Sequence, residues 1–148
     1  MIHMWSILCK KAIVDNETNV ISLFEILEKL TITPNLLVNN LTDIPAEFVM
    51  PLDFEIVTSI SDLPEKSKKI LLKIELFNAA KEKMGETENE IIAPAEAKAL
   101  RSRVVFNTIK IKGKGEYTFS INIKEDNKGT YKEVSKIPLE VEIAKPAI

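Results

Sequence analysis

Few residues in this sequence carry side chains that could act as nucleophiles, bases or metal ligands. His3 and Cys9 are the only histidine and cysteine. A zinc site would have to be completed by carboxylates, and a serine or cysteine nucleophile would depend on His3 as its base. We interpret His3 as an incidental polar residue. Cys9, in an apolar segment, is interpreted as a small buried side chain rather than a reactive thiol, so we predict no catalytic, cofactor-binding or metal-binding residues.

The acidic residues are numerous but scattered, and their spacing favours solvated faces over acid–base chemistry. One group follows Gly85 and consists of Glu86, Glu88 and Glu90. Calcium would need several aspartates at one end of the fold. The candidates lie in predicted turns and are Asp15, Asp43, Asp62 and Asp126. Nothing in the sequence places those turns together, so we predict no calcium site.

Two lysine- and glycine-containing patterns also have ordinary structural explanations. Gly113-Lys114-Gly115 lacks the spacing of a phosphate-binding loop, and we expect it to join two strands. Lys110, Lys112 and Lys114 alternate on one face. That face could contact an acidic partner, but an outward or lysine-blunted edge is the interpretation we prefer.

Composition narrows the class of protein. The 148 residues include 20 basic and 22 acidic side chains, for a formal net charge of -2, which disfavours nucleic-acid binding. A single cysteine allows no intrachain disulfide and suits a reducing compartment. The first residues lack a signal-peptide pattern, and no apolar run reaches the ~18 residues of a membrane span. We therefore expect a cytoplasmic protein without membrane or nucleic-acid partners.

The elements that would position these residues begin with a long apolar segment broken once, at DNETN. We predict a hairpin with arms at residues 4–14 and 20–32, in which Val14 lies opposite Val20 and Leu8 opposite Ile26. Residues 22–30 also fit a helix, because Ser22 and Glu25 form a capping-box pattern. The β-branched residues on either side favour the strand.

The remaining segments predict more strands. Residues 48–57 alternate, with Pro51 indicating an edge strand or a bulge, and residues 69–77, 103–112, 117–123 and 137–143 are also strand-like. We interpret residues 78–90 as a charged turn, with a short strand at 90–92. Residues 94–103, with a proline first and repeated alanines, are the best candidate for a helical turn or more. The sequence thus predicts an all-β fold, or a β-rich fold with a short helix, as a single antiparallel β-sandwich over residues 1–148.

A family resemblance rests on four short motifs. They are W-S-I-L-C from residue 5, A-I-V-D from residue 12, T-N at 18–19 and I-S-L-F-E-I-L-E from residue 21. Together they resemble the opening of an uncharacterised bacterial family of small proteins, clearly over residues 5–30 and more weakly over 115–141. The resemblance implies a β-sandwich-like architecture and brings no activity with it.

Two functions from different classes remain open at this point. The first is a non-enzymatic β-sandwich that binds another protein or itself. The second is a small-ligand-binding or carboxylate-dependent catalytic domain, with its site between the sheets or at polar inserts such as residues 34–45 and 78–90. We favour the first, because no nucleophile, metal or phosphate motif is recognisable.

Overall fold

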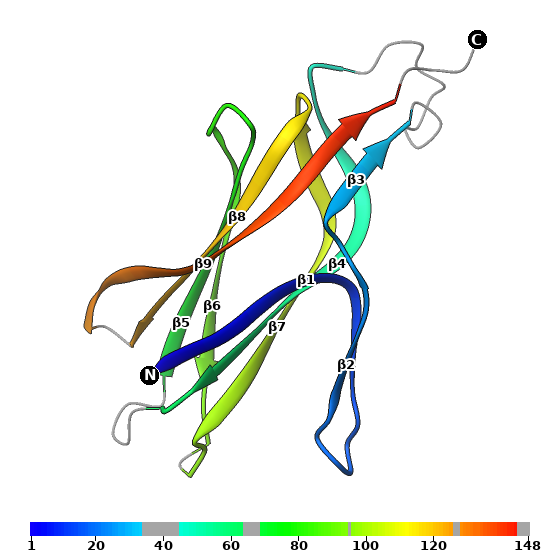
Figure 1. The fold of residues 1–148 in the computed structure, drawn as a ribbon. Helices are drawn as coiled ribbons and strands as arrows, with labels where there is room; N and C mark the ends of the chain where they lie inside the picture. Colours follow the sequence, from blue (N-terminus) through cyan, green and yellow to red (C-terminus); the bar gives the residue numbers. More distant parts are fainter. Residues whose placement is uncertain (34–44, 64–68, 95, 126–127, 145–148) are drawn as a thin grey trace.

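The protein folds into two β-sheets that pack face to face (Figure 1). The structure is a computed structural model that describes residues 1–33, 45–63, 69–94, 96–125 and 128–144. The described strands are β1 (Ile2–Val14), β2 (Ile21–Ile26), β3 (Lys29–Ile32), β4 (Glu47–Ser61), β5 (Lys69–Phe77), β6 (Lys83–Ile92), β7 (Ala99–Lys112), β8 (Gly115–Glu125) and β9 (Lys128–Ile143).

The smaller sheet has the strand order β2-β1-β4-β7 and the larger sheet the order β3-β9-β8-β5-β6. Every pairing between these strands is antiparallel except that of β3 with β9. The predicted all-β sandwich is therefore confirmed, with one parallel pair added. Within the described ranges there is no helix that could cross a membrane.

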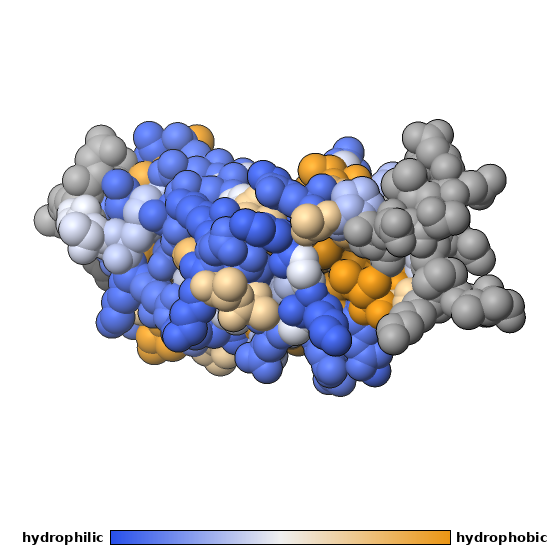
Figure 2. Space-filling view, turned by 90° about the horizontal axis from the view of Figure 1, so that it is seen from above, coloured by the Kyte–Doolittle hydropathy of each residue, from blue (hydrophilic) through white to orange (hydrophobic). Residues whose placement is uncertain are grey.

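The core lies between the sheets and follows the period of two in the sequence. On β5, Ile70, Leu72, Ile74 and Leu76 all face inward and are at most 7% exposed, as their alternation predicts. Burying such a side chain contributes about 1.5–3 kcal/mol each. The face of the molecule seen in Figure 2 is mainly hydrophilic, with several separate hydrophobic areas.

The predicted second arm of the hairpin, residues 20–32, is wrong in one respect, because it is not one strand. β2 pairs with β1 in the smaller sheet, and the chain then crosses to the larger sheet, where β3 pairs with β9. Leu30 and Ile32 are buried in the core, whereas Phe24 and Ile26 remain about half exposed. The strand interpretation of residues 22–30 is confirmed, and the capping-box alternative is not.

The predicted register of the hairpin is off by one residue. Val14 pairs with Ile21, not with Val20. The loop closes between Asp15 and Val20, whose N–H and C=O groups are 2.9 Å apart, so four residues form the turn instead of five. Asn19 makes the shorter loop possible with a φ of 60°, a conformation that Asn tolerates better than most residues.

Two further predictions need correction, and both concern polar segments. Residues 78–90 are not a charged turn, because β6 begins at Lys83 and pairs along β5. Residues 94–103 contain no helix in the described part: Ala97 donates one hydrogen bond to the Pro94 carbonyl, and β7 then starts at Ala99. In both cases pairing with a neighbouring strand outweighs the local signals for turn and helix.

Pro51 lies at a bulge, as predicted, although β4 is not an edge strand. The pairing of β4 with β7 shifts between Pro51 and Phe54. On its other side β4 pairs with β1 only as far as Glu55. Pro51 therefore needs no ladder hydrogen bond on that side.

Tyr117 fastens the connection between the two sheets. Its buried hydroxyl is 2.7 Å from the N–H of Lys112 and 2.7 Å from the C=O of Gly113. A tyrosine in this position, just inside the strand after a crossing between sheets, is a feature of immunoglobulin-type sandwiches. Gly115, between Gly113 and Tyr117 in the sequence, has a φ of 127°. A side chain would not fit there, because an added Cβ would lie 2.6 Å from Ala79 Cβ.

The strand order agrees with that arrangement. β9-β8-β5-β6 corresponds to strands G, F, C and C′ of a variable-type sandwich, and β4-β7 corresponds to B and E. In the immunoglobulin order a strand D lies beyond E. Among the described strands none occupies that position, and β7 is the edge of its sheet.

Candidate functional site

A cleft opens on the side of the sandwich where both sheets end. β6 is the last strand of the larger sheet and β7 the last strand of the smaller sheet. The cleft between them has a volume of about 530 Å³ and is lined by residues of β4, β5, β6, β7 and β8. It exists because no described strand of the smaller sheet covers the inner face of β6.

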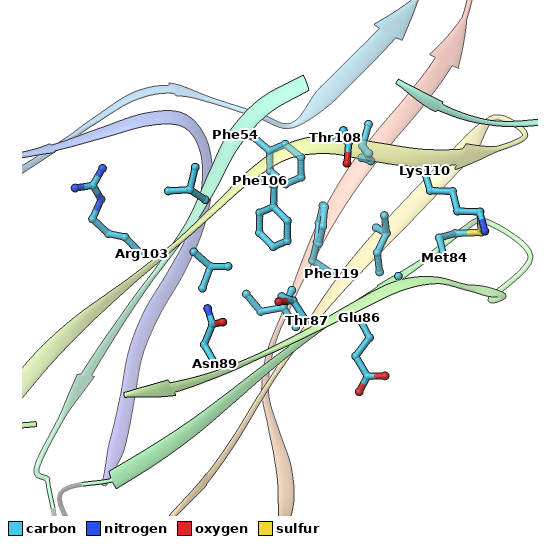
Figure 3. A pocket seen from close by; sticks show the side chains of 16 residues that line it. Phe54, Met84, Glu86, Thr87, Asn89, Arg103, Phe106, Thr108, Lys110 and Phe119 are labelled. Carbon is cyan, nitrogen blue, oxygen red and sulfur yellow. The ribbon is translucent and has the colours of Figure 1, made fainter. Parts of the chain in front are cut away.

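Three phenylalanines form the floor of the cleft (Figure 3). The rings of Phe54 and Phe106 are stacked, with centroids 4.7 Å apart and an interplanar angle of 9°. Phe119 is tilted against Phe54 at 5.8 Å. Phe54 and Phe119 are buried, while Phe106 is only partly buried. Phe106 is therefore the ring of the three that a bound molecule can contact directly.

The wall on β6 is formed by small and uncharged residues. Gly85, Thr87 and Asn89 share the inner face of the strand because they pair with inward residues of β5. A Cβ added at Gly85 would have no atom within 4 Å. Thr87 and Asn89 point toward the phenylalanines in Figure 3 and are only half-buried.

The charged residues of the lining are held away from the interior by ion pairs. Lys110 Nζ lies 2.8 Å from Glu47 and Lys83 Nζ lies 2.7 Å from Glu86. The hydrogen bond from Lys110 holds the pKa of the Glu47 carboxyl below its ordinary value, and Lys83 does the same for Glu86. The Arg103 guanidinium points out of the cleft in Figure 3. The interior of the cleft is therefore uncharged and mainly apolar, with Thr87 and Asn89 as polar groups on the β6 wall.

Arg103 instead fastens the β1–β2 hairpin to the outer face of the smaller sheet. Its Nε and Nη2 atoms are both 2.9 Å from Glu55 Oε1, and Nη2 also donates to the Ala12 carbonyl at 2.8 Å. Glu55 Oε2 accepts the Ala12 N–H at 2.9 Å. β1 pairs with β4 only as far as Cys9. Beyond that residue the buried Glu55 carboxylate accepts the Ala12 N–H in place of a strand partner.

The only histidine and the only cysteine lie outside the cleft lining. His3 Nε2 is 2.8 Å from Ser6 Oγ, which is 2.9 Å from Thr58 Oγ1, and burial lowers the pKa of His3. Cys9 is fully buried, as predicted. Burial, followed by the charge of Glu55, raises the pKa of its thiol, which keeps the sulfur in the less reactive protonated form.

The other sequence candidates also have structural roles where they are described. Gly113-Lys114-Gly115 connects β7 to β8, as predicted. Lys110 and Lys112 are exposed and pair with Glu47 and Glu82. Within the described ranges, no three His, Cys, Asp or Glu side chains are grouped to hold a metal ion. Residues 34–44, with Asp43, lie outside the described residues, as does Asp126.

The cleft was not predictable from the apolar pattern, because its wall is a polar strand. Glu86, Glu88 and Glu90 alternate with Thr87 and Asn89 along β6. That alternation has the period of a strand, but both sets are polar, so it resembles a solvated turn. A search for charged–uncharged alternation would have found it.

Comparisons with protein-family models and with curated proteins found no match. The fold and the cleft therefore define the class to which the chain is assigned: a β-sandwich whose core is open at one side.

Proposed function

We propose that this protein is a non-enzymatic protein-interaction module that binds apolar side chains of a partner in the cleft between β6 and β7. The observation that carries the proposal is the cleft between two edge strands, where the Phe106 ring is partly exposed above the buried rings of Phe54 and Phe119. Exposed apolar surface of this kind is desolvated by a partner at a gain of about 25 cal/mol per Å². A lining that is mainly apolar, with uncharged Thr87 and Asn89 on one wall, suits packing better than catalysis. We also propose a bacterial, cytoplasmic setting, which rests on the sequence alone.

A second candidate function is the binding of a small apolar ligand in the same cleft. Its volume of about 530 Å³ lies within the roughly 300–1,000 Å³ of common ligand pockets. Thr87 and Asn89 could orient such a ligand through hydrogen bonds. The small-ligand function predicts that a compact molecule binds in the cleft, whereas the protein-interaction function predicts that an extended segment of a partner binds there.

The test places a side chain in the cleft. Gly85 has an ordinary strand conformation and open space around its Cβ, so Gly85→Ile should fold well and fill part of the cleft. The probe is a short peptide with alternating isoleucine and threonine and a lysine at each end. Its binding to both proteins is measured by NMR titration of the protein amides and by calorimetry.

We expect the peptide to shift amides of β6 and β7 and to bind Gly85→Ile about ten-fold more weakly or worse, a loss of about 1.4 kcal/mol. Glu90→Val is the matched control, because it adds an apolar β-branched side chain on the outer face of the same strand. It should bind as the parent does. Anilinonaphthalene sulfonate, a compact apolar probe, is titrated in parallel. If only this dye binds in the cleft, the small-ligand function is favoured, and binding of neither probe contradicts both proposals.

A further inference from the structure

The smaller sheet ends one strand earlier than the larger sheet, and this mismatch is what opens the cleft. Four strands in the order β2-β1-β4-β7 face five in the order β3-β9-β8-β5-β6. The inward side chains of β5 are at most 7% exposed, but those of Thr87, Asn89 and Ile91 on β6 are only half-buried. Among the described residues, no strand of the smaller sheet covers the inner face of β6 as β4 and β7 cover that of β5.

The backbone of β7 is suited to receive another strand. From Ala99 to Phe106 it pairs with β4 in unbroken register. Every second residue of an edge strand directs its N–H and C=O groups away from the sheet, which leaves a regular row of donors and acceptors. This stretch overlaps the cleft at Arg103–Phe106.

β6 is a poorer template for the same addition. Its outer face carries a row of charges, Glu86, Glu88 and Glu90. Such a row discourages strand pairing at an edge. The better template on this side of the sandwich is therefore the Ala99–Phe106 part of β7.

Resting on the proposed function, we propose that the partner supplies an extended segment that adds to β7 as a fifth strand of the smaller sheet. The added strand occupies the position of strand D in the immunoglobulin order. Its alternate side chains point into the cleft against Phe106 and the inner face of β6. Because Lys110 and Glu86 already have ion-pair partners, a charge on those inward side chains would find none, so the inward residues are apolar.

This recognition combines two complementarities. Main-chain hydrogen bonds to β7 are independent of side-chain identity and provide affinity. The partly exposed Phe106 ring and the apolar lining around it select apolar residues at every second position. The space over Gly85 leaves room for a large side chain in the inward set.

The experiment uses the full chain and the alternating isoleucine–threonine peptide. Amide hydrogen exchange is measured by NMR with and without the peptide. We expect protection of every second amide between Ala99 and Phe106, because only the amides that point away from β4 gain a partner. Two versions of the peptide, N-methylated at one or the other alternate set of amides, should differ by about ten-fold or more in affinity, since only one set faces β7.

Each other outcome overturns the inference in an identifiable way. Binding without protection of β7 amides, or with equal affinity of the two methylated peptides, would show that the cleft takes side chains only; the proposed function would stand and the added strand would not. Protection of β6 in place of β7 would assign the wrong edge. A concentration-dependent dimer in light scattering that Gly85→Ile abolishes would make a second copy the occupant and overturn the assignment to another protein.

Discussion

At the scale of single residues, one buried hydroxyl has a large structural effect. Tyr117 is fully buried and bonds the main chain at the point where it passes from β7 to β8. Burial, ahead of the opposing hydrogen bond from Lys112, raises the pKa of the phenol, so it remains a donor in the physiological range. The Tyr117 ring packs in the core, and its hydroxyl is hydrogen-bonded to the main chain of Lys112 and Gly113. One side chain therefore stabilises both the core and the connection from β7 to β8.

Tyr117→Phe should lower the free energy of unfolding by about 1–3 kcal/mol, because the N–H of Lys112 loses its acceptor and the carbonyls of Lys112 and Gly113 lose their donor. Urea denaturation followed by circular dichroism measures the change. Tyr131→Phe is the control, since that ring lies between Lys73 and Lys124 on the outer face and keeps its packing without the hydroxyl. Equal losses in the two variants would contradict a special role for Tyr117.

The sequence predicts the burial of many single residues, but it does not predict the role of residues whose partners are distant in the sequence. The inward set on β5 and the burial of Cys9 follow from apolar alternation, which is a local property. The role of Glu55 does not, because its partners Ala12 and Arg103 are 43 and 48 residues away. No spacing in the sequence indicates that Glu55 will accept hydrogen bonds from Ala12 and Arg103.

At the scale of elements, the β1–β2 hairpin is the end of the smaller sheet that has its own small core. Cys9 and Ala12 of the hairpin form this cluster with Val57 of β4, and Trp5, Ile21 and Leu23 pack against them. Two arginines of β7 hold the hairpin in place, Arg103 through Glu55 and Arg101 through Asn19 at the loop. The hairpin itself was predictable, but its register and its division into β2 and β3 depend on a turn conformation and on a partner strand at the other end of the chain.

Glu55→Ala should loosen this hairpin while the two sheets remain paired. Removing the carboxylate deprives the Ala12 N–H and the Arg103 guanidinium of their acceptor, and hydrogen bonds to charged groups are worth about 1.5–3 kcal/mol each. Amides of residues 11–14 and 21–24 should exchange roughly ten-fold faster or more, measured by native-state hydrogen exchange. Glu47→Ala, which removes an exposed ion pair on the same strand, should leave those rates unchanged. Uniform acceleration across both sheets would show that Glu55 supports global stability instead.

At the scale of the whole molecule, stability should depend on the protonation of one side chain. Burial lowers the pKa of His3 from its ordinary value of 6.5. Below about pH 6.5 the unfolded chain then binds more protons than the folded protein does, so stability rises with pH and is lost as the pH falls. The carboxyls with lowered pKa act in the same direction but only at more acidic pH, below about 4.5.

The free energy of unfolding should therefore decrease between about pH 7 and pH 5.5 in the parent protein and stay nearly constant over this range in His3→Gln. Urea titrations at a series of pH values provide the measurement. His3 is the only group with an ordinary pKa in this window, since the chain has one histidine. Identical slopes in parent and variant would contradict the assigned direction of the shift.

The crossing from β2 to β3 has a consequence for the order in which the protein can fold during synthesis. β3 leaves the ribosome well before its partner β9, because five described strands lie between them in the sequence. Pairings this distant in sequence are slow to form, because the loop-closure entropy is lost before the contacts are gained. The β1–β2 hairpin can form early from neighbouring residues, whereas Leu30 and Ile32 must wait for β9. A nascent chain that lacks β9 therefore leaves β3 without its partner strand and exposes the edge of β8 in the larger sheet.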